Sequence, residues 1–247
     1  MQSDRAPRVL IIPGLNGDPG MLLRAAPLLF PGWQPVAFNH HRDLAAGGVE
    51  GLAQRALDCL LSDSADAGPV YVCGESFGGT VALTLAHMAP ERIAGLLLFS
   101  TFGWYPSALA RRGAGALAAW SFLGGRMGVT VYQASRLFSI PSQLGLRFSS
   151  EVFHGYVGRP RSDIEAYRTK AELSLTFDAR PWLGTIEAST FVLTGRWDPV
   201  VPVSAGRQLA RAMPNATLHT VGGGHLVHLV NASHVGMLIA QWAHSMH

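Results

Sequence analysis

The chain has 247 residues, of which 48% are hydrophobic and 14% charged; this composition excludes a disordered protein and fits one large domain, or one domain with an insertion. The net charge of +3 comes from 19 basic and 16 acidic residues, without the dense Lys/Arg stripe of a nucleic-acid-binding protein. The two cysteines, Cys59 and Cys73, are too few for a disulfide framework and lack metal-binding spacing.

Neither end of the chain has the pattern of a membrane or export segment. The apolar run after MQSDRAPR has only four residues, too short for a secretory signal. Residues 212–247 contain no Asp, Glu, Lys or Arg, but Gly and His residues interrupt them, so we expect a buried closing strand and helix there and no membrane span. We therefore expect a soluble, cytoplasmic protein.

Short aliphatic or aromatic runs alternate with helical patterns along the chain. The predicted strands are Arg8–Ile12, Gln34–Phe38, Val70–Cys73, Ile93–Phe99, Thr190–Thr194 and Thr217–Val221. The predicted helices are Met21–Phe30, Val49–Leu61, Phe77–Met88, Val203–Met213 and His228–His244. Continuous apolar runs of this length are typical of strands buried on both faces, and the alternation predicts a doubly wound α/β fold with a mostly parallel sheet.

The segment 102–177 interrupts this rhythm with helical patterns and no strand. Compact domains rarely contain structureless loops of that length, so we predict an inserted helical lid at 102–177, on a core formed by 1–101 and 178–247. The lid has a net charge of +5 and the core −2. The positive charge of the lid indicates either a solvated helical surface or a docking surface for an anionic partner.

The motif GESFGG, which includes Ser76, follows a predicted strand and precedes a predicted helix. It fits G-x-S-x-G, in which a serine on a sharp strand-to-helix turn exposes its hydroxyl above the sheet. The alternative is an ordinary serine at a helix N-terminus in a glycine-rich turn. The strand and helix on either side favour a nucleophile.

A nucleophilic serine needs a base, and His225 lies in GGGHLVHL between the last predicted strand and helix. That loop belongs to the carboxyl edge of the sheet, where open α/β folds place their sites. His40 and His41 follow the second strand at the same edge and are the main competitors. His228, three residues beyond His225, has two interpretations: a residue that lines the same site, or, as the favoured one, a helix-capping or solvent-exposed residue.

The base needs an orienting carboxylate, and Asp198 lies in GRWDP, the segment that directly follows the strand TFVLT. Its alternative interpretation is an Asp-Pro turn, and its rivals are Asp178 and Asp43. The order Ser76, Asp198, His225 is the order Ser…acid…His of α/β-hydrolases.

The segments GESFGG, TGRWDPVVP and GGGHLVHL together resemble the nucleophile, acid and histidine signatures of the α/β-hydrolase fold superfamily, in particular small lid-bearing serine esterases. The resemblance covers nearly the whole chain except the insertion. It implies a catalytic triad of Ser76, Asp198 and His225. Because the N-terminus has no room for two leading strands of the family, we expect about six strands instead of eight.

The resemblance also implies an oxyanion hole made by the backbone N–H groups of Phe77 and Leu15, with Asn16 as the next candidate after Leu15. The chain departs from the family where a histidine usually steadies that loop, because Pro13 stands there. It departs again at Asn39–Asp43, where the family often has Asp-x-Arg-Gly.

A serine nucleophile excludes the relatives that use aspartate, and carboxylic ester hydrolysis is the expected activity, without cofactor or metal. The substrate is expected to be a small-molecule acyl ester, with Trp104 and Asn16 among the residues that bind it. The alternatives are hydrolysis of thioesters or of esters linked to an acyl carrier protein or coenzyme A that docks on the basic lid; pimeloyl-carrier methyl ester esterases are among the similar proteins. A non-catalytic ligand receptor with the same fold is the alternative of another class.

Overall fold

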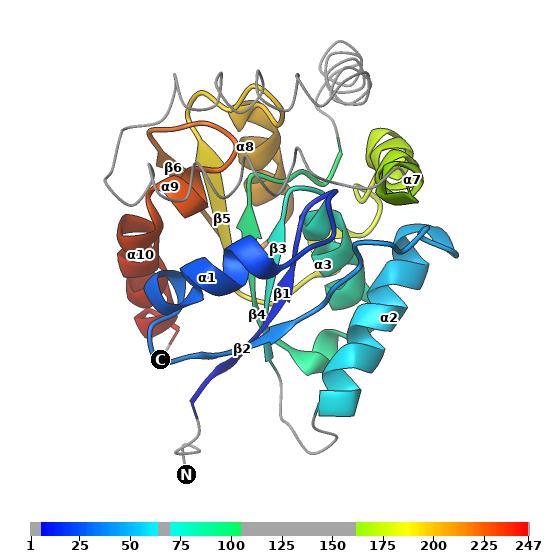
Figure 1. The fold of residues 1–247 in the computed structure, drawn as a ribbon. Coiled ribbons are helices and arrows are strands. Elements are labelled where there is room, and N and C mark those ends of the chain that lie inside the picture. The colour runs from blue at the N-terminus through cyan, green and yellow to red at the C-terminus, as the bar shows by residue number, and fades with distance from the viewer. Residues whose placement is uncertain (1–5, 64–69, 105–161, 247) are drawn as a thin grey trace.

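The computed structural model describes residues 6–63, 70–104 and 162–246. Its centre is a six-stranded parallel sheet with the strand order β2-β1-β3-β4-β5-β6 (Figure 1). The strands are β1 (Arg8–Ile12), β2 (Gln34–Ala37), β3 (Val70–Glu75), β4 (Ile93–Phe99), β5 (Thr190–Gly195) and β6 (Ala216–Val221). The number of strands and the fold class predicted from the sequence are confirmed.

Helices cover both faces of the sheet, as Figure 1 shows. They are α1 (Gly20–Leu29), α2 (Gly48–Asp63), α3 (Phe77–Met88), α7 (Ser162–Thr176), α8 (Val203–Ala212), α9 (Val227–Val230) and α10 (Ala232–His244), with short 3-10 turns at Pro90–Arg92 and Leu183–Thr185. None of the helices in the described ranges is long and apolar enough to cross a membrane.

Alternating side chains of the strands form two apolar layers, one on each face. On β1, Leu10 and Ile12 pack toward α2, α3 and α8, whereas Val9 and Ile11 pack toward α1, α9 and α10. The four inner strands are nearly continuous apolar runs because helices cover them from both sides. The edge strand β2 is partly exposed. It begins with a polar residue and a proline, Gln34 and Pro35.

The long insertion leaves and re-enters the core at adjacent points. Trp104 and Asp178 form an isolated antiparallel bridge, and the backbone N–H of Ala179 donates to the carbonyl of Gly103 at 2.8 Å. The last helix of the insertion, α7, packs against α3. Residues 105–161 of the predicted lid lie outside the described residues, so the lid stays a prediction.

Candidate active site

Ser76 occupies the sharp turn between β3 and α3. Its φ of 52° and ψ of −120° place this non-glycine residue in a strained backbone region that is common at functional sites. The turn is held on both sides: the Ser76 N–H donates to the carbonyl of Phe99 at 2.9 Å, and the Thr101 hydroxyl donates to the carbonyl of Ser76 at 2.6 Å. The hydroxyl of Ser76 is thereby displayed at the carboxyl edge of the sheet.

Two glycines of the motif are required by close backbone contacts. A Cβ atom on Gly74 would lie 2.6 Å from the carbonyl oxygen of Gly78, across the turn. A Cβ atom on Gly78 would lie 2.2 Å from the carbonyl oxygen of Ile12, at the end of β1. Glycine at both positions therefore lets α3 begin directly against the central strands, as a strand–nucleophile–helix turn requires.

His225 lies between β6 and α9 and contacts both Ser76 and Asp198. Its Nε2 is 3.0 Å from Ser76 Oγ, and its Nδ1 is 2.8 Å from Asp198 Oδ2. Because a carboxylate only accepts hydrogen bonds, Nδ1 carries the proton and donates to Asp198. Nε2 is then left to accept the hydrogen bond of the Ser76 hydroxyl. This is the geometry that a nucleophile, a base and an orienting acid require.

Asp198 is held in the turn that follows β5. Its Oδ1 accepts hydrogen bonds from the backbone N–H groups of Val200 and Val201, at 2.8 and 2.9 Å, so Oδ2 is directed to His225. The acid loop is tied to the histidine loop because the Trp197 N–H donates to the carbonyl of Gly223 at 3.0 Å.

The rival acids are engaged elsewhere. Asp43 pairs with Arg55 at 2.7 Å, and Asp178 pairs with Arg180 at an exposed position. Neither carboxylate hydrogen-bonds a histidine ring in the described part of the chain, so Asp198 is the carboxylate that the fold brings to His225.

The electrostatic surroundings favour the protonated form of His225. Burial lowers its pKa, but the charge of Asp198, the hydrogen bond to Asp198 and the charge of Glu75 outweigh burial, and the net result is a pKa above 6.5. A base with a raised pKa accepts the serine proton more readily, provided that the pH keeps it neutral beforehand.

The competing histidines have other surroundings. The Nε2 of His40 lies 3.0 Å from the carbonyl of Pro13, and the Nδ1 of His41 lies 2.9 Å from the carbonyl of Asn16. The interpretation of His228 as a capping or solvent-exposed residue was wrong: it is fully buried, and its ring lies tilted against that of Phe99 at a centroid distance of 5.3 Å. Burial, and secondarily the charge of His225, lower the pKa of His228 to about 3, so this ring stays neutral.

Glu75 is a site residue that the sequence analysis missed. It is buried beside Ser76; its Oε2 accepts the backbone N–H of Gly14 at 3.3 Å, and its Oε1 lies 3.8 Å from His228 Nε2. Burial raises the pKa of Glu75, while the charge of His225 and the Gly14 N–H oppose that shift. A glutamate at the end of an otherwise apolar strand, next to the motif serine, was the signal available in the sequence.

The loop predicted to supply half of the oxyanion hole lies against Ser76. A Cβ atom on Gly14 would lie 3.4 Å from the Cβ atom of Ser76, which places the next residue, Leu15, beside the site. Phe77 is the first residue of α3, so its N–H has no acceptor within the helix. That both N–H groups bind an oxyanion stays a prediction.

The two predicted substrate-binding residues have structural contacts of their own. Asn16 is buried, and its Oδ1 accepts the N–H of Asp18 at 3.3 Å. Trp104 bridges to Asp178 at the base of the insertion, with the guanidinium of Arg180 5.7 Å from its ring centroid. Their roles in binding stay predictions. Residues 105–161 of the basic lid lie outside the described residues, so its role in docking a partner also stays a prediction.

The family model of the alpha/beta hydrolase fold matches residues 53–232. A poly(3-hydroxyalkanoate) depolymerase from Ectopseudomonas oleovorans is 30% identical over 203 residues, covering 79% of this chain and 66% of the relative, so the chain spans just under two thirds of that protein.

Two further matches span most of the chain. A pimeloyl-[acyl-carrier protein] methyl ester esterase from Photobacterium profundum is 26% identical, covering 82% of this chain and 80% of the esterase. The crystal structure of the enol-lactonase from Burkholderia xenovorans has a TM-score of 0.74 at 18% identity, covering 98% of this chain and 93% of that one. The chain therefore belongs to the alpha/beta hydrolase fold family.

Proposed function

We propose that this hydrolase-family protein is a serine hydrolase that cleaves a carboxylic ester through an acyl-enzyme intermediate. The observation that carries the proposal is the continuous hydrogen-bond chain from Ser76 Oγ to His225 Nε2 at 3.0 Å and from His225 Nδ1 to Asp198 Oδ2 at 2.8 Å. A nucleophile, a base within hydrogen-bond reach and an orienting acid are the minimum for acyl transfer.

In the proposed reaction, Ser76 Oγ attacks the ester carbonyl while its proton passes to His225 Nε2. Asp198 keeps the Nδ1 proton in place and stabilises the imidazolium that forms. The carbonyl oxygen becomes negative and is held by the N–H groups of Leu15 and Phe77. His225 then protonates the departing alkoxide, and a water molecule activated by His225 releases the acid and regenerates Ser76.

The relatives support an ester as the scissile bond. The name of one refers to a methyl ester on an acyl carrier protein, and that of another to a poly(3-hydroxyalkanoate). A carrier-linked or coenzyme A-linked substrate is favoured by the distribution of charge, +5 in residues 102–177 against −2 elsewhere. Glutamine in place of Arg147, Arg159 and Arg161 should then lower kcat/KM for the carrier conjugate selectively, with a loss that shrinks as salt rises.

The direct test is hydrolysis of p-nitrophenyl esters and the matching thioesters over a range of acyl lengths. We expect turnover by the wild type and a loss of about 10⁶-fold in kcat for Ser76→Ala. Ser62→Ala, at an exposed serine of α2, is the matched control and should keep full activity. Saturable ligand binding without turnover, unaffected by Ser76→Ala, would instead indicate a receptor.

A further inference from the structure

Several hydrogen bonds connect the loop after β2 to the loop after β1. The His40 N–H donates to the carbonyl of Gly17 at 2.9 Å, and His41 Nδ1 contacts the carbonyl of Asn16 at 2.9 Å. The ring of His40 reaches the carbonyl of Pro13 through Nε2 at 3.0 Å. These contacts hold both ends of the segment 13–17, which carries Leu15.

The fit between the two loops is tight. Gly17 has a φ of 71°, and a Cβ atom on it would lie 2.5 Å from the carbonyl carbon of His40 and from the N atom of His41. The loop after β1 therefore rests directly on the peptide that joins the two histidines.

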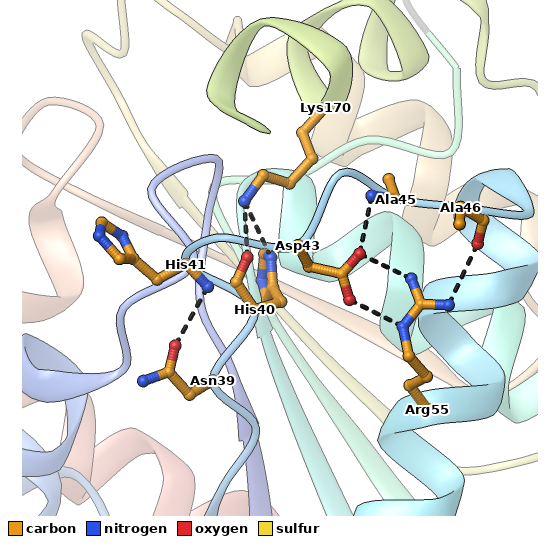
Figure 2. Close-up of polar contacts among 8 residues, drawn as sticks. All are labelled: Asn39, His40, His41, Asp43, Ala45, Ala46, Arg55 and Lys170. Carbon is orange, nitrogen blue, oxygen red and sulfur yellow. Dashed lines mark hydrogen bonds and ion pairs between the residues drawn. The ribbon is translucent and has the colours of Figure 1, made fainter. Parts of the chain in front are cut away.

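His40 is buried with 1% of its surface exposed, near the rings of Phe38 and Phe77, at centroid distances of 5.5 and 6.1 Å. Lys170 of α7 approaches it from the insertion side. The Lys170 Nζ donates to the carbonyl of His40 at 2.8 Å and lies 3.4 Å from its Nδ1, as Figure 2 shows.

Both partners of the ring require the same tautomer. The carbonyl of Pro13 can only accept, so Nε2 must carry the proton. An ammonium group can only donate, so Nδ1 of His40 must accept from Lys170. Burial, and secondarily the charge of Lys170, lower the pKa of His40 to about 4, so the ring stays neutral near pH 7. Because its Nε2 donates to the carbonyl of Pro13, His40 is unsuited to accept the proton of Ser76.

Lys170 is the single lysine of the chain, and its side chain is fully buried. Burying an ammonium is costly unless its protons find acceptors. The small ammonium group of lysine can donate to both the carbonyl and the Nδ1 atom of His40. The planar guanidinium group of arginine is larger and would need more space.

We propose that His40 is a positioning residue that holds the oxyanion loop through the carbonyl of Pro13, and that Lys170 fixes the ring of His40 from helix α7. This inference rests on the proposed function, because the position of Leu15 affects rate only if Ser76 attacks an acyl group. The pair also connects the end of the insertion to the oxyanion hole.

The test compares His40→Gln with His40→Asn. A glutamine amide nitrogen reaches the position of Nε2 and can donate to Pro13, whereas the shorter asparagine places its nitrogen where Nδ1 lies. We expect His40→Asn to lower kcat for a p-nitrophenyl ester about 10- to 100-fold with KM within about threefold, because small displacements of stabilising groups act on the transition state. His40→Gln should stay within about fivefold of the wild type.

A second readout does not depend on the natural substrate. A p-nitrophenyl phosphonate reacts when Ser76 Oγ bonds to phosphorus, the bond to p-nitrophenolate breaks and the serine proton goes to His225; the phosphoryl oxygen then lies in the oxyanion hole. The rate of p-nitrophenolate release should fall in His40→Asn and recover in His40→Gln. Rates equal to wild type in both variants, or an equal loss in both, would overturn the role of the hydrogen bond to Pro13.

Failure of the proposed function has a different signature, because the wild type itself would then leave Ser76 unlabelled.

A measurement on the unmodified protein covers the case in which a variant does not fold. ¹⁵N NMR of the His40 ring should show a protonated Nε2 and an unprotonated Nδ1. A protonated Nδ1 with a bare Nε2 would overturn the proposal, because that ring could not donate to Pro13.

Discussion

The most informative single substitution is Leu15→Pro, which removes one predicted oxyanion donor at a turn position that proline favours. The Gly17 N–H donates to the carbonyl of Gly14 at 2.9 Å, so residues 14–17 form a β-turn with Leu15 as its second residue. Neither Leu15 nor Asn16 has a positive φ, which leaves a type I-like turn. Proline is favoured at the second position of such turns.

The magnitude follows from the number of donors. With Leu15 N–H lost and Phe77 N–H retained, one of two oxyanion hydrogen bonds disappears. Removing one such donor costs about 10²–10³ in kcat, or about 2.7–4 kcal/mol. In the described part of the chain the Leu15 N–H donates no other hydrogen bond, so its loss leaves no buried acceptor unpaired.

Leu15→Ala is the matched control, because the side chain packs against the core but alanine keeps the N–H. Both variants should be assayed with a p-nitrophenyl ester and by thermal unfolding. We expect the alanine variant to stay within a few-fold of wild-type kcat and the proline variant to lose about 10²–10³. Equal kcat in both variants, with the proline variant folded, would refute the role of Leu15.

Three further predictions concern the charges around His225. Asp198→Asn should lower kcat about 10⁴-fold with little change in melting temperature, because the amide favours the wrong tautomer of His225; a loss below tenfold would contradict this. The kcat/KM profile should fall on the acid side with a midpoint above 6.5, because the raised pKa of His225 keeps the base protonated to higher pH; a midpoint below 6.5 would contradict the assignment. Glu75→Gln retains an acceptor for the Gly14 N–H but removes a charge that raises the pKa of His225, so the midpoint should move to lower pH; an unchanged midpoint would show that Glu75 is uncharged there.

The strands and the three triad candidates could be predicted from the sequence because each depends on local pattern. Ser76, Asp198 and His225 each lie in the short segment that follows an apolar run, and in a parallel sheet all such segments meet at the carboxyl edge. Boundaries were less accurate. β3 extends to Glu75 because Gly74 and Glu75 still pair with Leu98 and Phe99 of β4. The last predicted helix is divided at Asn231, whose side chain donates to the carbonyl of Gly222 at 3.1 Å.

The supporting residues of the site depend on contacts between distant segments. His40 and Lys170 are 130 positions apart, and no periodicity relates a loop after β2 to a helix in an insertion. His228 was interpreted as a helix-capping or solvent-exposed residue, yet the short helix α9 turns it inward toward Phe99 and Glu75. Such pairings become visible only when the sheet order is known.

The most direct test of the account is to trap the acyl-enzyme. The protein is mixed with p-nitrophenyl acetate, quenched during the first turnover and digested, and the peptides are analysed by mass spectrometry. We predict one acetyl group on Ser76, a matching burst of p-nitrophenol, and neither in Ser76→Ala. Hydrolysis that persists in Ser76→Ala, or an acetyl group carried by another residue in the wild type, would contradict the proposed mechanism.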